Sequence, residues 1–287
     1  MIDGLDLELS LERRIASVEC EPYSFQTSHR IDELKVLLAD GTRTELLLKN
    51  LRRLELDAAV SLAKPDFLDN PQREQVAYRL LAGAGMGIPL CYDAGEDWLL
   101  LEKVEGVELW QLGELEAWVD AAKWLSRLHG KFANSAPISD HLLRYDRDYF
   151  SLWPRRAQRA HPALARVVAR YDRVIQILLS ERTTFVHGDF YASNVLVGGD
   201  RISAVDWEMA GAGPGVLDLA ALVSGWGDAE RSTIVAGYGE VSSEALDAAQ
   251  LHLAVQWLGW SPKWAPPPEH ARDWLADALA AAERLEL

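Results

Sequence analysis

Four polar side chains with chemically useful groups lie in one mostly apolar segment, FVHGDFYASNVLVGGDRISAVDWEMAG, which covers residues 185–211. They are His187, Asp189, Asn194 and Asp206, and many of their neighbours are Val, Leu, Ile or Ala. Because burying an unpaired charge is costly, such groups either pair with one another or bind something else. The segment is therefore the first candidate for a functional site.

A hairpin explains the spacing of these groups. Two short strand-like runs, NVLV and ISAVDW, flank GGD at residues 198–200, which predicts a tight turn. Asn194 begins one arm and Asp206 closes the other, so antiparallel pairing brings them side by side, with Cβ atoms about 5 Å apart. An amide oxygen and a carboxylate suit Mg²⁺, and Asp189 lies close enough to orient a nucleophile beside that metal.

The chain before this segment supplies elements that must position it. Strands are expected at residues 14–24, 33–39 and 44–50 and, twice, within residues 87–106. Asp40-Gly41 predicts the turn between the second and third strands. A helix is expected from near Pro71 through residues 73–85, where glycines end it.

From about residue 114 the pattern becomes helical. Apolar residues recur at helical spacing over residues 114–130, and Gly130 ends the run. Residues 155–180 and 243–285 are also expected to be helical, the latter interrupted by SPKWAPPPEH. The chain therefore predicts an α+β fold with a small, strand-rich N-terminal lobe and a larger, mostly helical C-terminal lobe.

Composition limits the class of protein. The chain has 287 residues, 49% of them hydrophobic, and a net charge of −15. An acidic protein is a poor partner for nucleic acid, and its charge suits either a cationic substrate or simple solubility. The two cysteines, Cys20 and Cys91, lack metal-ligand spacing and indicate a reducing compartment. No signal peptide or membrane span begins the chain, so we expect a cytoplasmic protein.

Two motifs resemble those of a known enzyme family. HGDFYASN followed by VDWE is similar to the catalytic loop and metal-binding motif of aminoglycoside phosphotransferases and their choline kinase-like relatives. The Asp-x4-Asn spacing is also that of the protein-kinase catalytic loop. The resemblance implies a protein-kinase-like two-lobed fold. Residues 1–101 would form the nucleotide-binding lobe, residues 102–287 the catalytic and acceptor-binding lobe, and residues 102–106 approximately the hinge.

The resemblance also implies an ATP- and Mg²⁺-dependent O-phosphotransferase that acts on a hydroxyl of a small molecule. Asp189 would accept the proton of that hydroxyl or orient it, while Asn194 and Asp206 would hold Mg²⁺. Asp218 would brace the catalytic loop, and His187 would be mainly structural. The acceptor stays open among antibiotics, other natural products, sugars and amino alcohols. ATP against GTP and the oligomeric state also stay open.

A nucleotide site upstream is implied in the same way. Lys49 ends the third strand and would neutralise the α- and β-phosphates, fixed by Glu74 from the helix that follows. Backbone groups of Glu102 and Val104 would meet the adenine. The loop YSFQTSHR departs from the Gly-rich loop of protein kinases because it contains no glycine. Hydroxyls and backbone N–H groups would meet the phosphates there instead, and the residues concerned are Ser24, Thr27 and Ser28.

Several other residues admit two interpretations. Glu208 suits either a metal contact or a structural hydrogen bond, and His129 suits a core or helix-terminal position. Six arginines suit either acceptor binding or a solvated helix face: Arg155, Arg156, Arg159, Arg166, Arg170 and Arg173. Four tryptophans suit either the core or the wall of an acceptor pocket: Trp226, Trp257, Trp260 and Trp264.

Two rival functions account for part of the pattern. A metal-dependent hydrolase would use His187, Asp189 and Asp206 as ligands, but it leaves Lys49 and Glu74 unexplained. A non-catalytic nucleotide-binding module would share the fold, yet no group required for catalysis is missing from the sequence.

Overall fold

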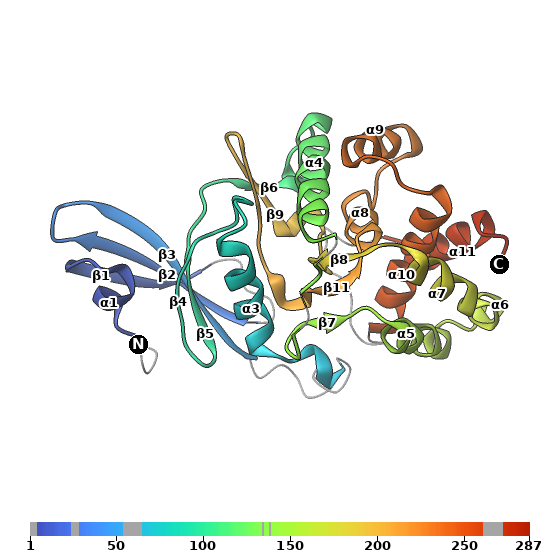
Figure 1. The fold of residues 1–287 in the computed structure, drawn as a ribbon, viewed down its shortest axis with the longest axis horizontal. Coiled ribbons are helices and arrows are strands. Elements are labelled where there is room, and N and C mark those ends of the chain that lie inside the picture. Colours follow the sequence, from blue (N-terminus) through green and yellow to red (C-terminus); the bar gives the residue numbers. More distant parts are fainter. Residues whose placement is uncertain (1–4, 24–28, 54–64, 134, 138, 261–271) are drawn as a thin grey trace.

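The structure, a computed structural model, describes residues 5–23, 29–53, 65–133, 135–137, 139–260 and 272–287. Figure 1 shows a sheet at the N-terminal end of the molecule and a helical part at the C-terminal end, with helix α3 between them. This arrangement confirms the predicted α+β fold with a strand-rich and a helical lobe. The boundary between residues 101 and 102 stays a prediction. The expectations for Ser24, Thr27, Ser28 and Trp264 fall outside the described residues.

The N-terminal sheet is antiparallel throughout, and its five strands are arranged in the order β1-β2-β3-β5-β4. Its elements are β1 (Ile15–Pro22), β2 (His29–Leu38), β3 (Arg43–Arg53), β4 (Cys91–Ala94) and β5 (Trp98–Glu102). The helical elements of this part are α1 (Leu7–Leu11), η1 (Asp66–Leu68) and α3 (Pro71–Ala82). Gly41 adopts a left-handed φ of 87° in the turn between β2 and β3, which confirms the predicted hairpin.

Both faces of this sheet carry buried apolar residues. Leu46 and Leu48 on one face join a cluster against which the N-terminal helix α1 packs. Leu99 and Leu101 on the other face pack with Tyr78 of α3. Because the strands alternate their side chains between the two faces, these clusters hold α3 against the side opposite α1.

Helix α3 begins where the sequence predicts it. The Asn70 side chain accepts a hydrogen bond from the Gln72 amide at 3.1 Å, and Pro71 occupies the first turn. This start fixes the position of Arg73 and Glu74, which lie buried in the same turn.

The C-terminal part combines helices with two small three-stranded sheets, β10-β9-β6 and β7-β11-β8. Its strands are β6 (Val107–Glu108), β7 (Leu143–Arg144), β8 (Thr183–Val186), β9 (Val195–Gly198), β10 (Arg201–Ala204) and β11 (Gly211–Pro214). Its α-helices are α4 (Leu115–Phe132), α5 (Arg147–Ala160), α6 (Ala165–Ala169), α7 (Tyr171–Ser180), α8 (Val216–Leu222), α9 (Asp228–Tyr238), α10 (Ser243–Trp260) and α11 (Trp274–Arg284). Its short 3₁₀ turns are η2 (Leu109–Gln111), η3 (Pro162–Leu164), η4 (Ala192–Asn194) and η5 (Trp207–Met209).

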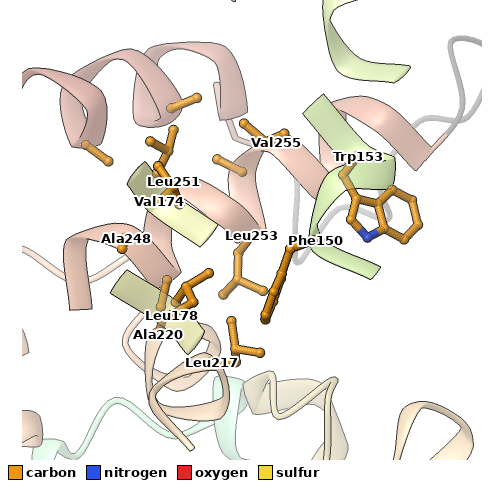
Figure 2. Close-up of a cluster of buried hydrophobic side chains, with 14 of the residues drawn as sticks. Phe150, Trp153, Val174, Leu178, Leu217, Ala220, Ala248, Leu251, Leu253 and Val255 are labelled. Carbon is orange, nitrogen blue, oxygen red and sulfur yellow. The ribbon is translucent and has the colours of Figure 1, made fainter. Parts of the chain in front are cut away.

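Helix α10 forms the centre of this part. Its residues 251–255 are all buried, so the helix has no polar face over that stretch. Figure 2 shows how the neighbours pack there, with Phe150 and Trp153 from α5 and Leu178 from α7 among the buried side chains. Within the described residues, no helix is both long and apolar enough to cross a membrane.

The structure differs from the sequence predictions mainly at element boundaries. The helical region expected at residues 155–180 starts earlier, at Arg147, and is divided into α5, α6 and α7. Pro162 begins η3 directly after the break, a first-turn position that suits proline, while Pro154 lies inside α5. The strand predicted to reach Trp207 ends at Ala204, and residues 207–209 form η5.

Candidate active site

The β9–β10 hairpin places the two predicted metal ligands at its open end. The register pairs Val195 with Ala204, and the Val205 amide donates to the Asn194 carbonyl at 3.0 Å. Asp206 follows one residue later. The hairpin inferred from GGD is therefore confirmed, and it brings Asn194 and Asp206 to the same end of the two strands.

Asp206 adopts an unusual backbone conformation at this point. Its φ of 65° and ψ of 68° are left-handed, which costs a residue other than glycine about 1–3 kcal/mol and is found mainly at functional sites. The conformation turns the chain from β10 into η5. The Asp206 Oδ1 atom lies 2.7 Å from the Lys49 ammonium, and the side chain is 35% exposed.

Lys49 lies between two carboxylates. Its Nζ atom is 2.7 Å from Asp206 Oδ1 and 2.8 Å from Glu74 Oε2, so the predicted pair with Glu74 is present. Burial alone would lower the pKa of Lys49, but the carboxylates of Asp206 and Glu74 outweigh it and raise that pKa well above its usual value. Burial raises the pKa of Glu74, an effect that the Lys49 charge opposes. The ammonium is therefore charged at neutral pH and held between the two carboxylates.

The turn that carries Asp189 depends on Gly188 and Asp218. Gly188 has a φ of +80°, and a Cβ atom there would lie 1.9 Å from Tyr145 Oη and 2.3 Å from the Met209 carbonyl oxygen. The Asp218 carboxylate accepts hydrogen bonds from the amides of His187 and Gly188 at 2.7 and 2.8 Å. Asp218 thus braces the loop, as the resemblance implied.

His187 is fully buried, and both of its ring nitrogens are in use. Nε2 donates to the Val205 carbonyl at 2.9 Å, and Nδ1 accepts from the Asp189 amide at 3.3 Å. Burial lowers the pKa of the ring, so the neutral tautomer with its proton on Nε2 fits this pattern. The geometry supports the structural role expected for His187 and removes it from the ligands of a metal hydrolase. Among the described residues, no three His, Cys, Asp or Glu side chains form a metal-binding group.

Asn194 connects the hairpin to the loop that carries Asp189. Its Nδ2 atom donates to the Asp189 backbone carbonyl at 2.8 Å and to Asp189 Oδ2 at 2.9 Å. Because the amide nitrogen faces Asp189, the amide oxygen is the group of Asn194 that can bind a cation. That oxygen and the Asp206 carboxylate are hard donors of the type that suits Mg²⁺, which usually takes few protein ligands beside phosphate and water.

The predicted hinge is held by contacts that the sequence did not indicate. The Glu102 amide donates to the Leu90 carbonyl at 2.8 Å. The Glu102 carboxylate accepts from Arg201 on β10 at 2.5 and 2.9 Å, and this hydrogen bonding lowers the pKa of Glu102. Arg201 also donates to the carbonyls of Gly87 and Ile88, so it ties both the predicted hinge and the segment before β4 to the hairpin.

Glu208 and His129 both have structural partners. The Glu208 carboxylate lies 3.4 Å from His29 Nε2 on β2, which favours the structural interpretation over a metal contact. His129 is buried at the end of α4, where Nε2 meets Asp218 at 3.1 Å and Nδ1 meets Tyr238 Oη at 2.8 Å. His129 therefore supports the residue that braces the catalytic loop.

A cavity of about 370 Å³ opens beside the loop that carries Asp189, and the sequence did not reveal its walls. Residues 191–193, which begin two positions after Asp189, form one side, and the ends of α8 and α11 form others. Its aromatic walls are Trp110, Trp118, Tyr191 and Trp274, and its charged walls are Arg272, Asp273 and Asp277.

The tryptophans considered in the sequence analysis, where the structure describes them, do not line this cavity. Trp257 stacks on Trp274 behind the cavity and donates to Tyr191 Oη at 2.5 Å. Trp226 packs edge-on against Trp118, and Trp260 stacks on Trp153 in the core. The stacking walls are therefore supplied mainly by aromatic residues far apart in the sequence, for which no local motif exists.

The six arginines of residues 155–173 do not line this cavity. Arg156 donates to the carbonyls of Gly259 and Trp260, and Arg173 donates to that of Leu285. The others on this stretch are exposed. The interpretation as a helix surface, with contacts to the C-terminal helices, is the one that the geometry supports.

Comparison with known proteins gives one family. A model of the phosphotransferase enzyme family matches residues 29–252, which is more than half of the chain. No curated protein matches the sequence.

Solved structures with a similar fold include macrolide 2′-phosphotransferase MphH from Brachybacterium faecium. It is 16% identical with a TM-score of 0.63, and the match covers 97% of this chain and 96% of that one. Choline kinase LicA from Streptococcus pneumoniae is 16% identical with a TM-score of 0.62, over 97% and 96% of the two chains. The streptomycin–ATP–APH(2″)-IIa complex is 16% identical with a TM-score of 0.56, over 100% and 98%. These likenesses confirm the kinase-like, two-lobed fold.

Proposed function

Because the chain belongs to the phosphotransferase enzyme family, we propose that it is an ATP- and Mg²⁺-dependent O-phosphotransferase acting on a hydroxyl of a small molecule. One observation carries the proposal: Lys49 links Glu74 to Asp206, at the end of the hairpin that also presents Asn194 to Asp189. These two groups of contacts lie at the same end of the hairpin, which supports Lys49 as a phosphate ligand, Asn194 and Asp206 as metal ligands and Asp189 as the catalytic carboxylate.

The chemistry follows from positioning and charge. Asn194 Oδ1 and the Asp206 carboxylate would hold Mg²⁺, which supplies charge neutralisation on the nucleotide phosphates when it is bound. Lys49 brings a permanent positive charge to the same phosphates. The Asp189 carboxylate, fixed through the Asn194 amide, would orient the acceptor hydroxyl and receive its proton. Phosphoryl transfer needs little more than this alignment, because its transition state is loose.

The nucleotide base would lie at the hinge. The Glu102 carbonyl and the Val104 amide are the backbone groups proposed to meet adenine. The Arg201 contacts with Glu102 hold this segment in place. The ATP in the complex of APH(2″)-IIa supports ATP as the phosphate donor.

The acceptor would bind in the aromatic cavity next to residues 191–193. A volume of about 370 Å³ is in the range of small-molecule sites, and aromatic walls suit flat or apolar faces of a ligand. The structural neighbours named above include proteins described as choline kinase and macrolide phosphotransferase, which differ in their acceptors. The proposal therefore names a class of acceptor, hydroxylated small molecules, and no single compound.

A panel of acceptors tests the proposal. Hydroxylated antibiotics, other natural products, sugars and amino alcohols are incubated with ATP and Mg²⁺, and ADP release above the acceptor-free rate is measured. We expect at least one acceptor to give stoichiometric ADP and phosphorylated product, with no product when EDTA replaces Mg²⁺. Product formation without a nucleotide would indicate a hydrolase, and nucleotide binding without turnover on any acceptor would favour the non-catalytic module.

A further inference from the structure

Arg73 is a buried arginine whose guanidinium hydrogen-bonds to backbone carbonyls from three segments of the chain. It is 3% exposed. Its Nη2 donates to Phe67 O at 2.7 Å, and Nη1 donates to Leu68 O at 3.1 Å and to Glu208 O at 2.8 Å. Its Nε donates to His141 O at 3.1 Å. A buried charge of this kind is costly unless such bonds satisfy it, so a stability gain alone gives little reason for an arginine here.

The contacts of Arg73 close a ring of interactions that also contains Glu74, Lys49 and Asp206. Arg73 and Glu74 are consecutive residues of α3. Glu74 reaches Asp206 through Lys49, while Arg73 reaches the carbonyl of Glu208, two residues beyond Asp206. Helix α3 is therefore attached twice to the short segment that carries the proposed metal ligand.

This double attachment has a mechanical consequence. Without Arg73, the connections between α3 and the turn η5 would be apolar packing and the ion pairs of Lys49 with Glu74 and Asp206. The Arg73 bond fixes the backbone of η5 directly against α3. It also restrains the left-handed turn at Asp206, which persists only if its surroundings hold it.

We propose that Arg73 is a positioning residue for phosphoryl transfer, which holds α3 and η5 together so that Glu74 and Asp206 both stay within reach of Lys49. The inference rests on the proposed function. An arginine is required because its planar fork donates in several fixed directions at once, whereas a lysine ammonium is a compact point charge on a flexible stem.

The test compares Arg73→Lys with wild type in calorimetric titrations with Mg²⁺ and a non-hydrolysable ATP analogue. Because losing a residue that orients metal ligands usually costs about 10- to 100-fold, we expect a loss of affinity of that size. In a Glu74→Gln background the same change should cost less than about threefold, because both changes disturb one ring of contacts. Arg73→Gln repeats the test without a buried charge if Arg73→Lys does not fold.

Arg156→Lys is the matched control. Arg156 also donates to backbone carbonyls, those of Gly259 and Trp260 at 2.8 and 3.1 Å, but it joins α5 to the end of α10. We expect Arg156→Lys to lower the melting temperature while leaving nucleotide affinity within about twofold of wild type.

Three possible results distinguish the positioning role of Arg73 from a purely structural one. Weaker nucleotide binding in Arg73→Lys, absent from Arg156→Lys and largely lost in the Glu74→Gln background, supports the positioning role. Wild-type affinity in a folded Arg73→Lys protein, or an equal loss in Arg156→Lys, overturns that role and leaves the proposed function intact. A wild-type protein that binds no Mg²⁺–nucleotide overturns both proposals.

Discussion

The change Glu74→Gln separates a true ion-pair network from a set of neighbouring charges. Glu74 and Lys49 are 3% and 7% exposed, and their charged atoms lie 2.8 Å apart. Breaking a buried pair by removing one partner typically costs about 3–5 kcal/mol. Lys49 keeps Asp206 at 2.7 Å, so its charge is not left alone, and we expect a smaller loss than this range, about 2–3 kcal/mol.

The assay is a double-mutant cycle of urea unfolding at neutral pH, with wild type, Glu74→Gln, Lys49→Met and the double variant. If the two side chains act as a unit, Lys49→Met should cost at least about 1 kcal/mol less in the Glu74→Gln background than in wild type. Affinity for Mg²⁺–ATP, measured on the same four proteins, should show the same non-additivity. Losses that add within about 0.5 kcal/mol would refute the network.

Lys103 supplies a matched control. Its Nζ atom also lies between two carboxylates, at 2.7 Å from both Glu33 and Glu45, but Glu45 is 50% exposed. Exposed pairs contribute about 0.2–1 kcal/mol, so Glu45→Gln should cost no more than that. A loss as large as that of Glu74→Gln would contradict the claim that burial makes the Lys49 network strong.

Two further predictions concern the metal site and the core. In Asp206→Asn the fold should persist, because asparagine tolerates a left-handed backbone. The affinity for Mg²⁺–ATP should fall about 100-fold, because losing one partner of a buried charge costs about 2–5 kcal/mol. Unchanged affinity, or an equal loss in Asp200→Asn on the same hairpin, would refute the assignment. His252 is buried in α10, and burial lowers its pKa from 6.5 to about 3. Between pH 6.5 and about pH 3, the ring is therefore protonated in the unfolded chain but neutral in the folded protein. Wild type should therefore lose about 2 kcal/mol more stability than His252→Gln on going from pH 7.5 to pH 5, measured by urea unfolding, and equal losses would show that His252 is not responsible.

The local part of the site could be predicted from the sequence. GGD at residues 198–200 fixes a tight turn, so the neighbours of that turn are determined by strand register alone. Asp189 and Asn194 are close in the chain and meet through the short 3₁₀ turn η4. The Lys49–Glu74 pair is predicted by resemblance to a family and not by residue spacing, because the two residues belong to different elements.

The rest of the site depends on contacts that leave no pattern in the sequence. Arg73 and Arg201 donate to backbone carbonyls of distant segments, and any residue type can supply such a carbonyl. The walls of the cavity come from η2, α4, the loop that carries Asp189 and α11, so Trp110 and Trp274 line one cavity only after the chain has folded. Arg156 could not be distinguished from an acceptor ligand until its bonds to the end of α10 were known.

The measurement that tests the central claim most directly is single-turnover phosphoryl transfer by Asp189→Asn, with ATP, Mg²⁺ and an acceptor found in the panel. The amide keeps the size of the side chain and can still accept a hydrogen bond from Asn194, but it cannot take the proton of the acceptor hydroxyl. General-base contributions are typically about 10²- to 10⁴-fold, so the rate of the chemical step should fall by that factor while affinity for Mg²⁺–ATP changes little. A chemical step at nearly the wild-type rate would contradict the role of Asp189 and, with it, the proposed mechanism.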